Sequence, residues 1–320
     1  MIEWVVGILL IALVVLALLS PLESARWWAD RGEAELRRTF EELPREIVPA
    51  EDGARAHLVY LSGIGDVGGN RLLDRESSWL VTLDEALPEV TVVSDVFPYS
   101  VDNRGLLQRT TVRLWSWLDH GRRARRIRIL HFLINLRNVL YVLISADPRY
   151  GPAHNIGLAQ EIWRSLQRHG YRPGSGRPVV LVGYSGGAQM SLGAAWFLSR
   201  AGVPVSVISI GGVFGDEPGL DRIEHLWHLI GAQDRVQLIG SVAFSGRWPT
   251  APLSSWGRAK REGRVTLRTI GDMRHDGGEA YFGRRAMGAD GRTHAETTRD
   301  EVVAILSTLG HDGEHPSGVG

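Results

Sequence analysis

The sequence predicts an α/β domain with a mostly parallel sheet and helices on both faces, and three observations indicate this fold class. Short apolar runs rich in β-branched residues recur along the chain, as in strands that are buried on both faces. Segments with helical spacing of apolar residues lie between several of these runs, as in strand–helix–strand units. Glycine-containing loops follow the runs, and ligand sites of parallel sheets form at that end of the strands.

Length and composition limit the classes of function. The chain has 320 residues, enough for one large domain, and its formal net charge is zero, so no overall field favours nucleic acid as a partner. It has no cysteine, which excludes disulfides, thiolate zinc sites and a cysteine nucleophile. We expect no cofactor and no metal, and a small-molecule or lipid substrate.

The N-terminal segment is predicted to be a transmembrane anchor over residues 1–22. Trp4–Leu22 carries no charged residue and is long enough to cross the hydrocarbon core as a helix. A cleaved signal peptide is the alternative, but Glu3 precedes the run and no arginine or lysine does. Glu23 would also occupy the first small position of a cleavage site before Ala25. We therefore favour a permanent single span.

Four arginines follow this run and no basic residue precedes it, which by the positive-inside rule places the large domain on the cytoplasmic side. Residues 23–52 are charged and are predicted to form a juxtamembrane stalk that Pro44 and Pro49 end. The main domain is expected over residues 53–310, with a flexible polar tail at 311–320.

The first predicted strand, His57–Leu61, leads into a glycine-rich loop. The loop fits the dinucleotide pattern G-x-G-x-x-G through Gly63, Gly65 and Gly68. That site also needs an acidic residue about 20 residues further on, at the end of the next strand. The next predicted strand, Val90–Val93, ends at Asp95, which lies too far along the chain. A nucleotide-dependent oxidoreductase is therefore the weaker interpretation of this loop.

The same patterns predict the other regular elements of the domain. Further strands are expected over Val179–Val182, Val203–Ile210, His225–Ile230 and Val265–Ile270. Helices are expected over Trp79–Leu87 and Ala153–Gly170, directly after residue 187, and over Thr297–Leu309.

Residues 106–147 are predicted to be an insertion between sheet elements. A dense run of arginines ends at Arg128, and the apolar segment Ile129–Ile144 follows it. A helix there would gather its polar residues into one narrow stripe with a wide apolar face; these residues are His131, Asn135 and Asn138. Arg137 argues against a second membrane span. A buried core helix, a strand near Leu140–Ile144, and a lid or membrane-surface helix remain as interpretations.

The strongest motif is Gly183-Tyr184-Ser185-Gly186-Gly187, which fits G-x-S-x-G. In a chain with 38 glycines the pattern alone is a weak indicator, but here a buried strand precedes it and a helical pattern follows. A sharp strand-to-helix turn needs glycine at both outer positions, and it lifts the serine hydroxyl out of the sheet. Ser185 is therefore the candidate nucleophile.

A serine hydroxyl needs a histidine to take its proton and a carboxylate to orient that histidine. Asp234 and His275 each follow a predicted late strand, so their loops should meet the Ser185 loop at one edge of the sheet. Asp216 also follows a strand and is the alternative acid. His294 is the alternative histidine and is expected to be solvated. Asp272 and Asp276 flank His275 but lack a metal-ligand spacing.

The order serine, acid, histidine at strand ends resembles the α/β-hydrolase superfamily over about His57 to Leu309, with no subfamily indicated. The resemblance implies an oxyanion hole formed by the N–H groups of Gly186 and of Ile64 or Gly65. It implies a serine hydrolase that cleaves a carboxylic ester through an acyl-serine. The predicted anchor, which lies outside the resemblance, would hold this hydrolase at a membrane, and a lid would suggest a lipophilic ester. Thioester or amide hydrolysis, acyl transfer, and an inactive binding or scaffold module are the alternatives.

Overall fold

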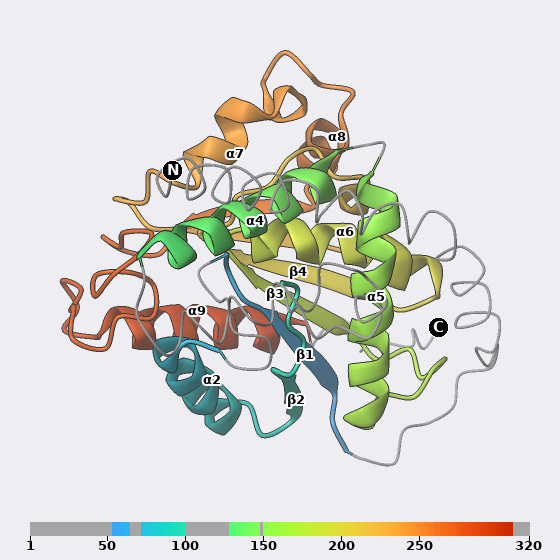
Figure 1. The fold of residues 1–320 in the computed structure, drawn as a ribbon. Helices are drawn as coiled ribbons and strands as arrows, with labels where there is room; N and C mark the ends of the chain where they lie inside the picture. The colour runs from blue at the N-terminus through green and yellow to red at the C-terminus, as the bar shows by residue number, and fades with distance from the viewer. Residues whose placement is uncertain (1–52, 65–71, 100–127, 148–149, 310–320) are drawn as a thin grey trace, which may run out of the picture.

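A computed structural model of the chain describes residues 53–64, 72–99, 128–147 and 150–309 (Figure 1). Several predictions fall outside these residues: the anchor over 1–22, the stalk over 23–52, Gly65, residues 106–127 of the insertion, and the tail over 311–320. Among the helices that are described, none is long and apolar enough to cross a membrane.

The described chain forms one six-stranded sheet in which every neighbouring pair is parallel, in the order β2-β1-β3-β4-β5-β6. The strands are β1 Ala56–Leu61, β2 Val90–Val93, β3 Val179–Tyr184, β4 Val205–Ile210, β5 Leu226–Ile230 and β6 Val265–Thr269. The predicted α/β fold with a parallel sheet is therefore confirmed. Strand order reverses between β1 and β3, and ligand crevices of such sheets open at the carboxyl ends of strands at this switch point.

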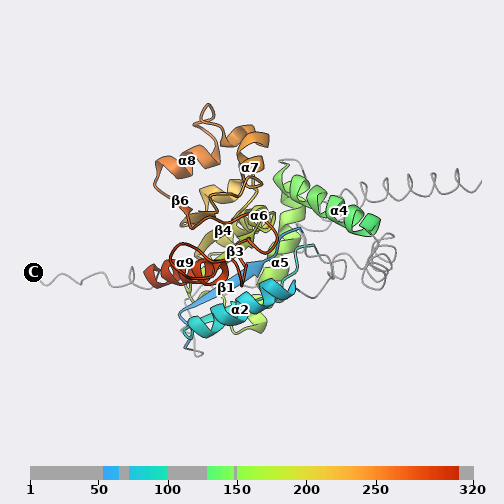
Figure 2. The same ribbon diagram turned by 90° about the vertical axis from the view of Figure 1, so that its left-hand side faces the viewer.

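Helices cover both faces of the sheet, as predicted (Figures 1 and 2). The longer ones are α2 Asp74–Ala86, α4 Arg128–Ala146, α5 Gly151–Arg168, α6 Gly187–Arg200 and α9 His294–Thr308. Alternate residues of β3 point to opposite faces: Val179 and Leu181 pack in a core with α5 and α6, whereas Val180 and Val182 pack in a second core with α2 and α9. Each face of the sheet thus has its own apolar core.

Element boundaries differ from the sequence-based ones for local reasons. β4 begins at Val205 because Pro204 has no N–H to give to a neighbouring strand, although its carbonyl accepts a hydrogen bond from Val179. α9 begins three residues early because Thr293 and Glu296 form a capping box, which satisfies N–H groups of the first turn. α2 also begins earlier than predicted, at Asp74, although no side chain caps its start.

The segment between β5 and β6 contains two short helices that the sequence analysis did not predict, α7 Leu238–Ala243 and α8 Ser255–Arg261, with the 3₁₀ turn η2 Ser245–Arg247 between them. Between β4 and β5 the chain forms only a 3₁₀ turn, η1 Pro218–Asp221. These elements are too short to show a helical repeat of apolar residues, which explains why the pattern missed them.

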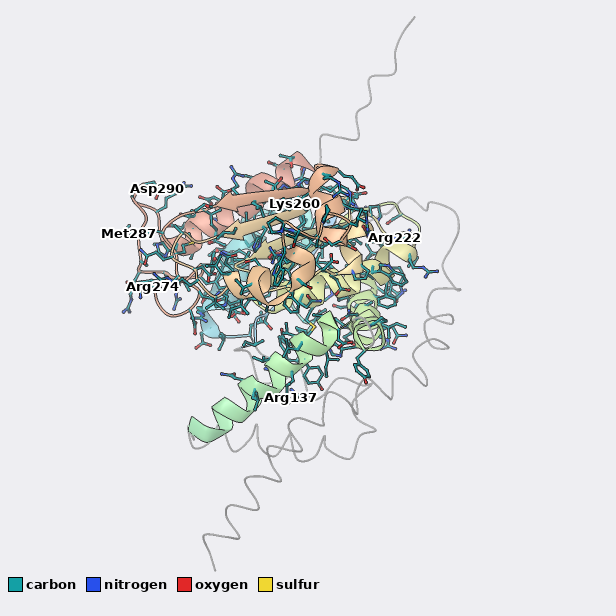
Figure 3. All side chains as sticks on the ribbon, turned by 90° about the horizontal axis from the view of Figure 1, so that it is seen from above. Arg137, Arg222, Lys260, Arg274, Met287 and Asp290 are labelled. Carbon is teal, nitrogen blue, oxygen red and sulfur yellow. The ribbon has the colours of Figure 1, made fainter. Side chains whose placement is uncertain are left out.

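The insertion forms a helix, α4, and not a strand near Leu140–Ile144. Asn135 and Asn138, three residues apart, lie on one side of this helix as predicted, but Asn135 is exposed whereas Asn138 is fully buried. Asn138 donates a hydrogen bond to the carbonyl of Ile64. Arg137, which Figure 3 labels on α4, is also buried; it donates to the carbonyl of Tyr99 and stacks on the Tyr141 ring. These contacts replace the hydrogen bonds to water that the two polar side chains lose on burial. For this reason α4 can point these polar residues toward the protein interior.

Candidate active site

Ser185 lies in the turn between β3 and α6, with a left-handed backbone conformation. Its φ is +53°, and it is the one non-glycine residue with a positive φ within the described part of the chain. Such a conformation disfavours a residue with a Cβ, so the turn must be held by its surroundings. The Ser185 N–H donates to the Ile210 carbonyl at the end of β4, and its carbonyl accepts from Val213. These two bonds fix the serine at the end of the sheet.

The glycines of the motif are required by close packing, as the sequence analysis predicted. A Cβ on Gly183 would lie 2.6 Å from the backbone of Ala188, and one on Gly187 would lie 2.3 Å from the Leu61 carbonyl oxygen. Both distances are shorter than any real carbon contact, and backbone cannot move aside as a flexible side chain can. The strand, turn and helix therefore fit together only with glycine at both outer positions.

The structure brings Ser185, His275 and Asp234 together in one hydrogen-bonded chain. Ser185 Oγ lies 2.8 Å from His275 Nε2, and His275 Nδ1 lies 2.9 Å from Asp234 Oδ2. Because an ionised carboxylate only accepts, the Nδ1 atom donates to Asp234, which leaves Nε2 free to accept the proton of the serine hydroxyl. The three residues come from loops that follow β3, β5 and β6.

Asp234 is held as a carboxylate by four donors. Its Oδ2 accepts from His275 and from the hydroxyl of Tyr281 at 2.7 Å, and its Oδ1 accepts from the backbone N–H groups of Val236 and Gln237. Burial alone would raise the pKa of this carboxyl, but the bonds from His275 and Tyr281 outweigh it and hold the pKa below its usual value. The aspartate is therefore ionised over the whole neutral range.

Two tyrosines position the histidine and its acid. The Tyr184 hydroxyl donates to the His275 carbonyl, and its ring stacks on the imidazole with the centroids 5.6 Å apart. Tyr281 accepts from the Gly231 N–H at 2.8 Å while it donates to Asp234. Sequence reasoning missed both roles. Tyr184 occupies a position where the motif accepts any residue, and Tyr281 lies in an irregular loop without a periodic signal.

Removal of the Tyr281 hydroxyl should destabilise the fold. We expect Tyr281→Phe to lower the free energy of unfolding by about 1–3 kcal/mol, because it leaves the buried Gly231 N–H without its acceptor. Urea titration measures this loss. Tyr171→Phe is the control, since that hydroxyl makes a longer contact, 3.4 Å, with the Arg177 carbonyl, and the loss should be smaller there. Equal losses in the two variants would contradict the role given to Tyr281.

The loop after β1 lies against the serine turn. A Cβ on Gly63 would lie 3.1 Å from the Ser185 Cβ, and one on Gly186 would lie 3.1 Å from the Ile64 side chain and 2.8 Å from the Tyr99 hydroxyl. Ile64 and Gly186, two of the predicted oxyanion residues, thus face the same small space beside Ser185. The third, Gly65, lies outside the described residues.

The alternative acid and histidine lie elsewhere. Asp216 Oδ1 accepts a hydrogen bond from the Trp256 N–H at 2.8 Å and so belongs to the start of α8. His294 is buried at the start of α9, where its Nδ1 lies 3.0 Å from the Glu279 carbonyl oxygen, so the expectation that it is solvated is wrong. The capping box of Thr293 and Glu296 makes it the first residue of α9, three residues earlier than predicted.

A cavity of about 320 Å³ opens above Ser185 and His275. Most of its wall is apolar, and more than half of the aliphatic and aromatic lining comes from α4, from the loop before α7 and from α7 and its end: Val139, Val142, Leu143, Val236, Ile239, Ala243 and Phe244. Its size and lining are typical of small-molecule sites. The insertion helix α4 therefore forms one wall of the cavity that covers the serine.

Charged residues also line the cavity. Arg75 donates to Asp276 at 2.6 Å, and Glu76 is fully buried and accepts from the Tyr60 hydroxyl. Burial would raise the pKa of Asp276, but the Arg75 guanidinium outweighs it and lowers that pKa. Asp272 accepts a hydrogen bond from the Gln233 side chain, whereas His275 bonds to Asp234.

Within the described residues, no cluster of three or more histidine, aspartate or glutamate side chains could hold a metal ion.

The comparisons with known proteins do not assign the chain to a family. No protein-family model matches it, and no curated protein or solved structure is significantly similar to it. The function must therefore be argued from the fold and from the geometry around Ser185.

Proposed function

We propose that the protein is a serine hydrolase of the α/β-hydrolase superfamily that cleaves a carboxylic ester through an acyl-serine intermediate. One observation supports this most: the Ser185–His275–Asp234 chain, with separations of 2.8 and 2.9 Å, begins at a serine in a positive-φ turn between a parallel strand and a helix. A nucleophile, a base and a residue that orients the base are the parts that acyl transfer needs. Their order along the chain is that of α/β-hydrolases.

In the acylation step, Ser185 Oγ attacks the carbonyl carbon of the ester while its proton passes to His275 Nε2. Asp234 holds the imidazole in the correct tautomer through Nδ1 and stabilises the imidazolium that forms. The tetrahedral intermediate then collapses, the bond to the alcohol oxygen breaks, and the imidazolium gives its proton to the departing alcohol. The serine is left as an ester of the acyl group.

The negative oxygen of the intermediate would lie at the start of α6, beside Gly186 and Ile64. Backbone N–H groups of these two residues are the proposed donors, and the positive end of the α6 dipole adds to their effect. Loss of one such donor costs about 2.7–4 kcal/mol of transition-state stabilisation in serine hydrolases. Deacylation repeats the sequence with water in place of Ser185, activated by His275.

The cavity wall supports an ester with an apolar acyl chain. Aliphatic and aromatic side chains of α4 and α7 would bury such a chain, and each buried methylene contributes about 0.8 kcal/mol. A lid is one of the roles that the sequence leaves open for the insertion, and in that role α4 would favour a lipophilic substrate.

Covalent labelling with a fluorophosphonate tests the proposal, because this reagent reacts only with an activated serine. We expect detergent-solubilised wild-type protein to be labelled at a stoichiometry of about one. Ser185→Ala should abolish the label. Ser307→Ala is the matched control, since Ser307 is exposed on α9 and its hydroxyl bonds to its own helix.

Two results would count against a serine hydrolase. Folded wild-type protein that stays unlabelled both in detergent and after addition of lipid would favour an inactive binding module. A label that persists in Ser185→Ala would place the reactive hydroxyl elsewhere in the chain.

A further inference from the structure

The segment from residue 235 to residue 261, here called the α7–α8 surface, exposes an unusual amount of apolar side chain. Val242 is 71% exposed and Leu253 is 79% exposed, the latter being the largest value among the large apolar residues that the structure describes. Other exposed apolar side chains of the segment are Val236, Leu238, Ile239 and Trp248. Single exposed apolar residues are ordinary, but a contiguous group of them indicates an interaction site.

The α7–α8 surface is also positively charged. The sequence has no aspartate or glutamate between Asp234 and Glu262, whereas it has five basic residues there: Arg235, Arg247, Arg258, Lys260 and Arg261. Arg247 is buried, and Arg258 forms an ion pair with Asp221 at 2.6 Å. Arg235, Lys260 and Arg261 are exposed, so their charges face whatever covers this surface.

This surface borders the mouth of the cavity above Ser185. Val236 and Ile239 are exposed and line the cavity at the same time, and Val139 and Leu143 of α4 do so from the opposite wall. Figure 2 shows α7 and α8 at one end of the molecule, with α4 on the side of α7, and Figure 3 labels Lys260 of α8. Val236 and Ile239 therefore connect the exposed apolar group of the α7–α8 surface to the wall of the cavity.

We propose that the α7–α8 surface, with the exposed residues of α4, docks on an anionic phospholipid bilayer. Apolar side chains that are interspersed with arginine and lysine, without acids, match the boundary between acyl chains and anionic headgroups. A symmetric contact between two copies would bring like charges together, which disfavours dimerisation through this surface. The apolar run Trp4–Leu22, predicted to be an anchor, would keep the domain near such a bilayer.

The docked orientation turns the cavity mouth toward the lipid. If the proposed function holds, an ester could then pass from the bilayer to Ser185 without crossing water. Only this path of the ester rests on the proposed function. The docking itself is independent of it.

The absence of cysteine makes a direct test possible in the full chain, because one introduced cysteine can be labelled without background. Val242→Cys carries an environment-sensitive fluorophore on the proposed surface. Val81→Cys is the matched control, since Val81 is also a strongly exposed valine, 58%, but lies on α2, far from α7 (Figure 1). Each full-length protein is reconstituted into vesicles of phosphatidylcholine with phosphatidylserine, with and without a lipid-borne quencher in the acyl region.

We expect the label at position 242 to shift its emission to the blue and to be quenched, and the label at position 81 to do neither, although the anchor tethers both proteins equally. Vesicles of phosphatidylcholine alone should reduce the quenching at 242. Salt should reduce it as well, since the Debye length falls from about 10 Å at 0.1 M to about 3 Å at 1 M. Lys260→Glu combined with Arg261→Glu should have the same effect in anionic vesicles.

Equal behaviour of the two labels would overturn the proposal, as would quenching at 242 that does not depend on anionic lipid. Energy transfer between labels on two copies, without quenching by lipid, would identify a second copy as the occupant. Because no turnover is measured, failure of docking and failure of the serine hydrolase assignment are distinguishable.

Discussion

Replacement of His275 by alanine should lower kcat for ester hydrolysis by about 10⁶-fold, the loss seen when a catalytic serine or histidine is removed from such an arrangement. The reason lies in the geometry: Nε2 is 2.8 Å from Ser185 Oγ and is the group placed to take its proton. Steady-state hydrolysis of a chromogenic ester measures the effect. KM should change little, because the apolar wall that would bind the acyl chain is untouched.

Two further variants test which aspartate, Asp234 or Asp216, orients His275. Asp234→Asn should lower kcat by about 10⁴-fold, since an amide there would favour the wrong tautomer of His275. Asp216→Asn should leave kcat within a few-fold of wild type, because Asp216 bonds to the start of α8 and not to His275. A large loss in Asp216→Asn together with a small loss in Asp234→Asn would contradict the arrangement. Similar small losses of kcat in His275→Ala, Asp234→Asn and Asp216→Asn would show that Ser185, His275 and Asp234 do not catalyse the reaction.

Glu217→Gln should stabilise the protein strongly at alkaline pH. Glu217 is buried, and its Oε2 accepts from Gln189 Nε2 at 2.7 Å. Burial raises the pKa of this carboxyl to about 8, although the Gln189 bond opposes the rise, and the nearby Asp216 charge adds to it. Gln189 also accepts from the Gly215 N–H, so the network links α6 to the loop after β4.

The sign of the pH effect follows from these pKa values. The folded state keeps the Glu217 proton up to about pH 8, whereas an unfolded glutamate loses it near its ordinary value of 4.5. Between these values the folded state binds more protons, so stability is fully present at acidic pH and is lost as the pH rises. Each pKa unit corresponds to about 1.4 kcal/mol, so the loss over the window is about 5 kcal/mol at most.

Urea unfolding of wild type and Glu217→Gln at about pH 5 and about pH 9 measures this difference. The glutamine keeps an acceptor for Gln189 but does not titrate, so its advantage over wild type should grow by several kcal/mol between the two pH values. Glu224→Gln is the control, because Glu224 is also a glutamate with a raised pKa but is less buried. An advantage of the Glu217 variant that is independent of pH would mean that Glu217 is already ionised in the folded state at neutral pH.

The sheet could be predicted from the sequence because its signals are local. The four residues of β2 were predicted without error, and the errors in β3 and β4 are two residues at one end. Buried parallel strands read as continuous apolar runs, and the glycines around Ser185 mark a turn that only glycine fits. The convergence of Ser185, Asp234 and His275 followed from their places at strand ends, before any distance was known.

The remaining features depend on contacts between distant segments. Tyr281 reaches Asp234 from an irregular loop, and Asn138 reaches Ile64 from the insertion, and neither contact leaves a pattern in the sequence. The polar residues of α4 were expected on one stripe because a helical repeat gives their spacing. The spacing does not show whether a buried hydrogen-bond partner is present for each of these polar residues. The short helices α7 and α8 were missed for the same kind of reason, since tertiary packing determines them more than periodicity does.

Capture of the acyl intermediate tests the central claim most directly. Wild-type protein is mixed with a p-nitrophenyl ester, quenched in acid during turnover, and digested for mass spectrometry. The proposed mechanism predicts a burst of about one nitrophenolate per protein and the mass of the acyl group on the peptide that carries Ser185. Turnover that leaves Ser185 unmodified, or an acyl group on a different side chain, would contradict it.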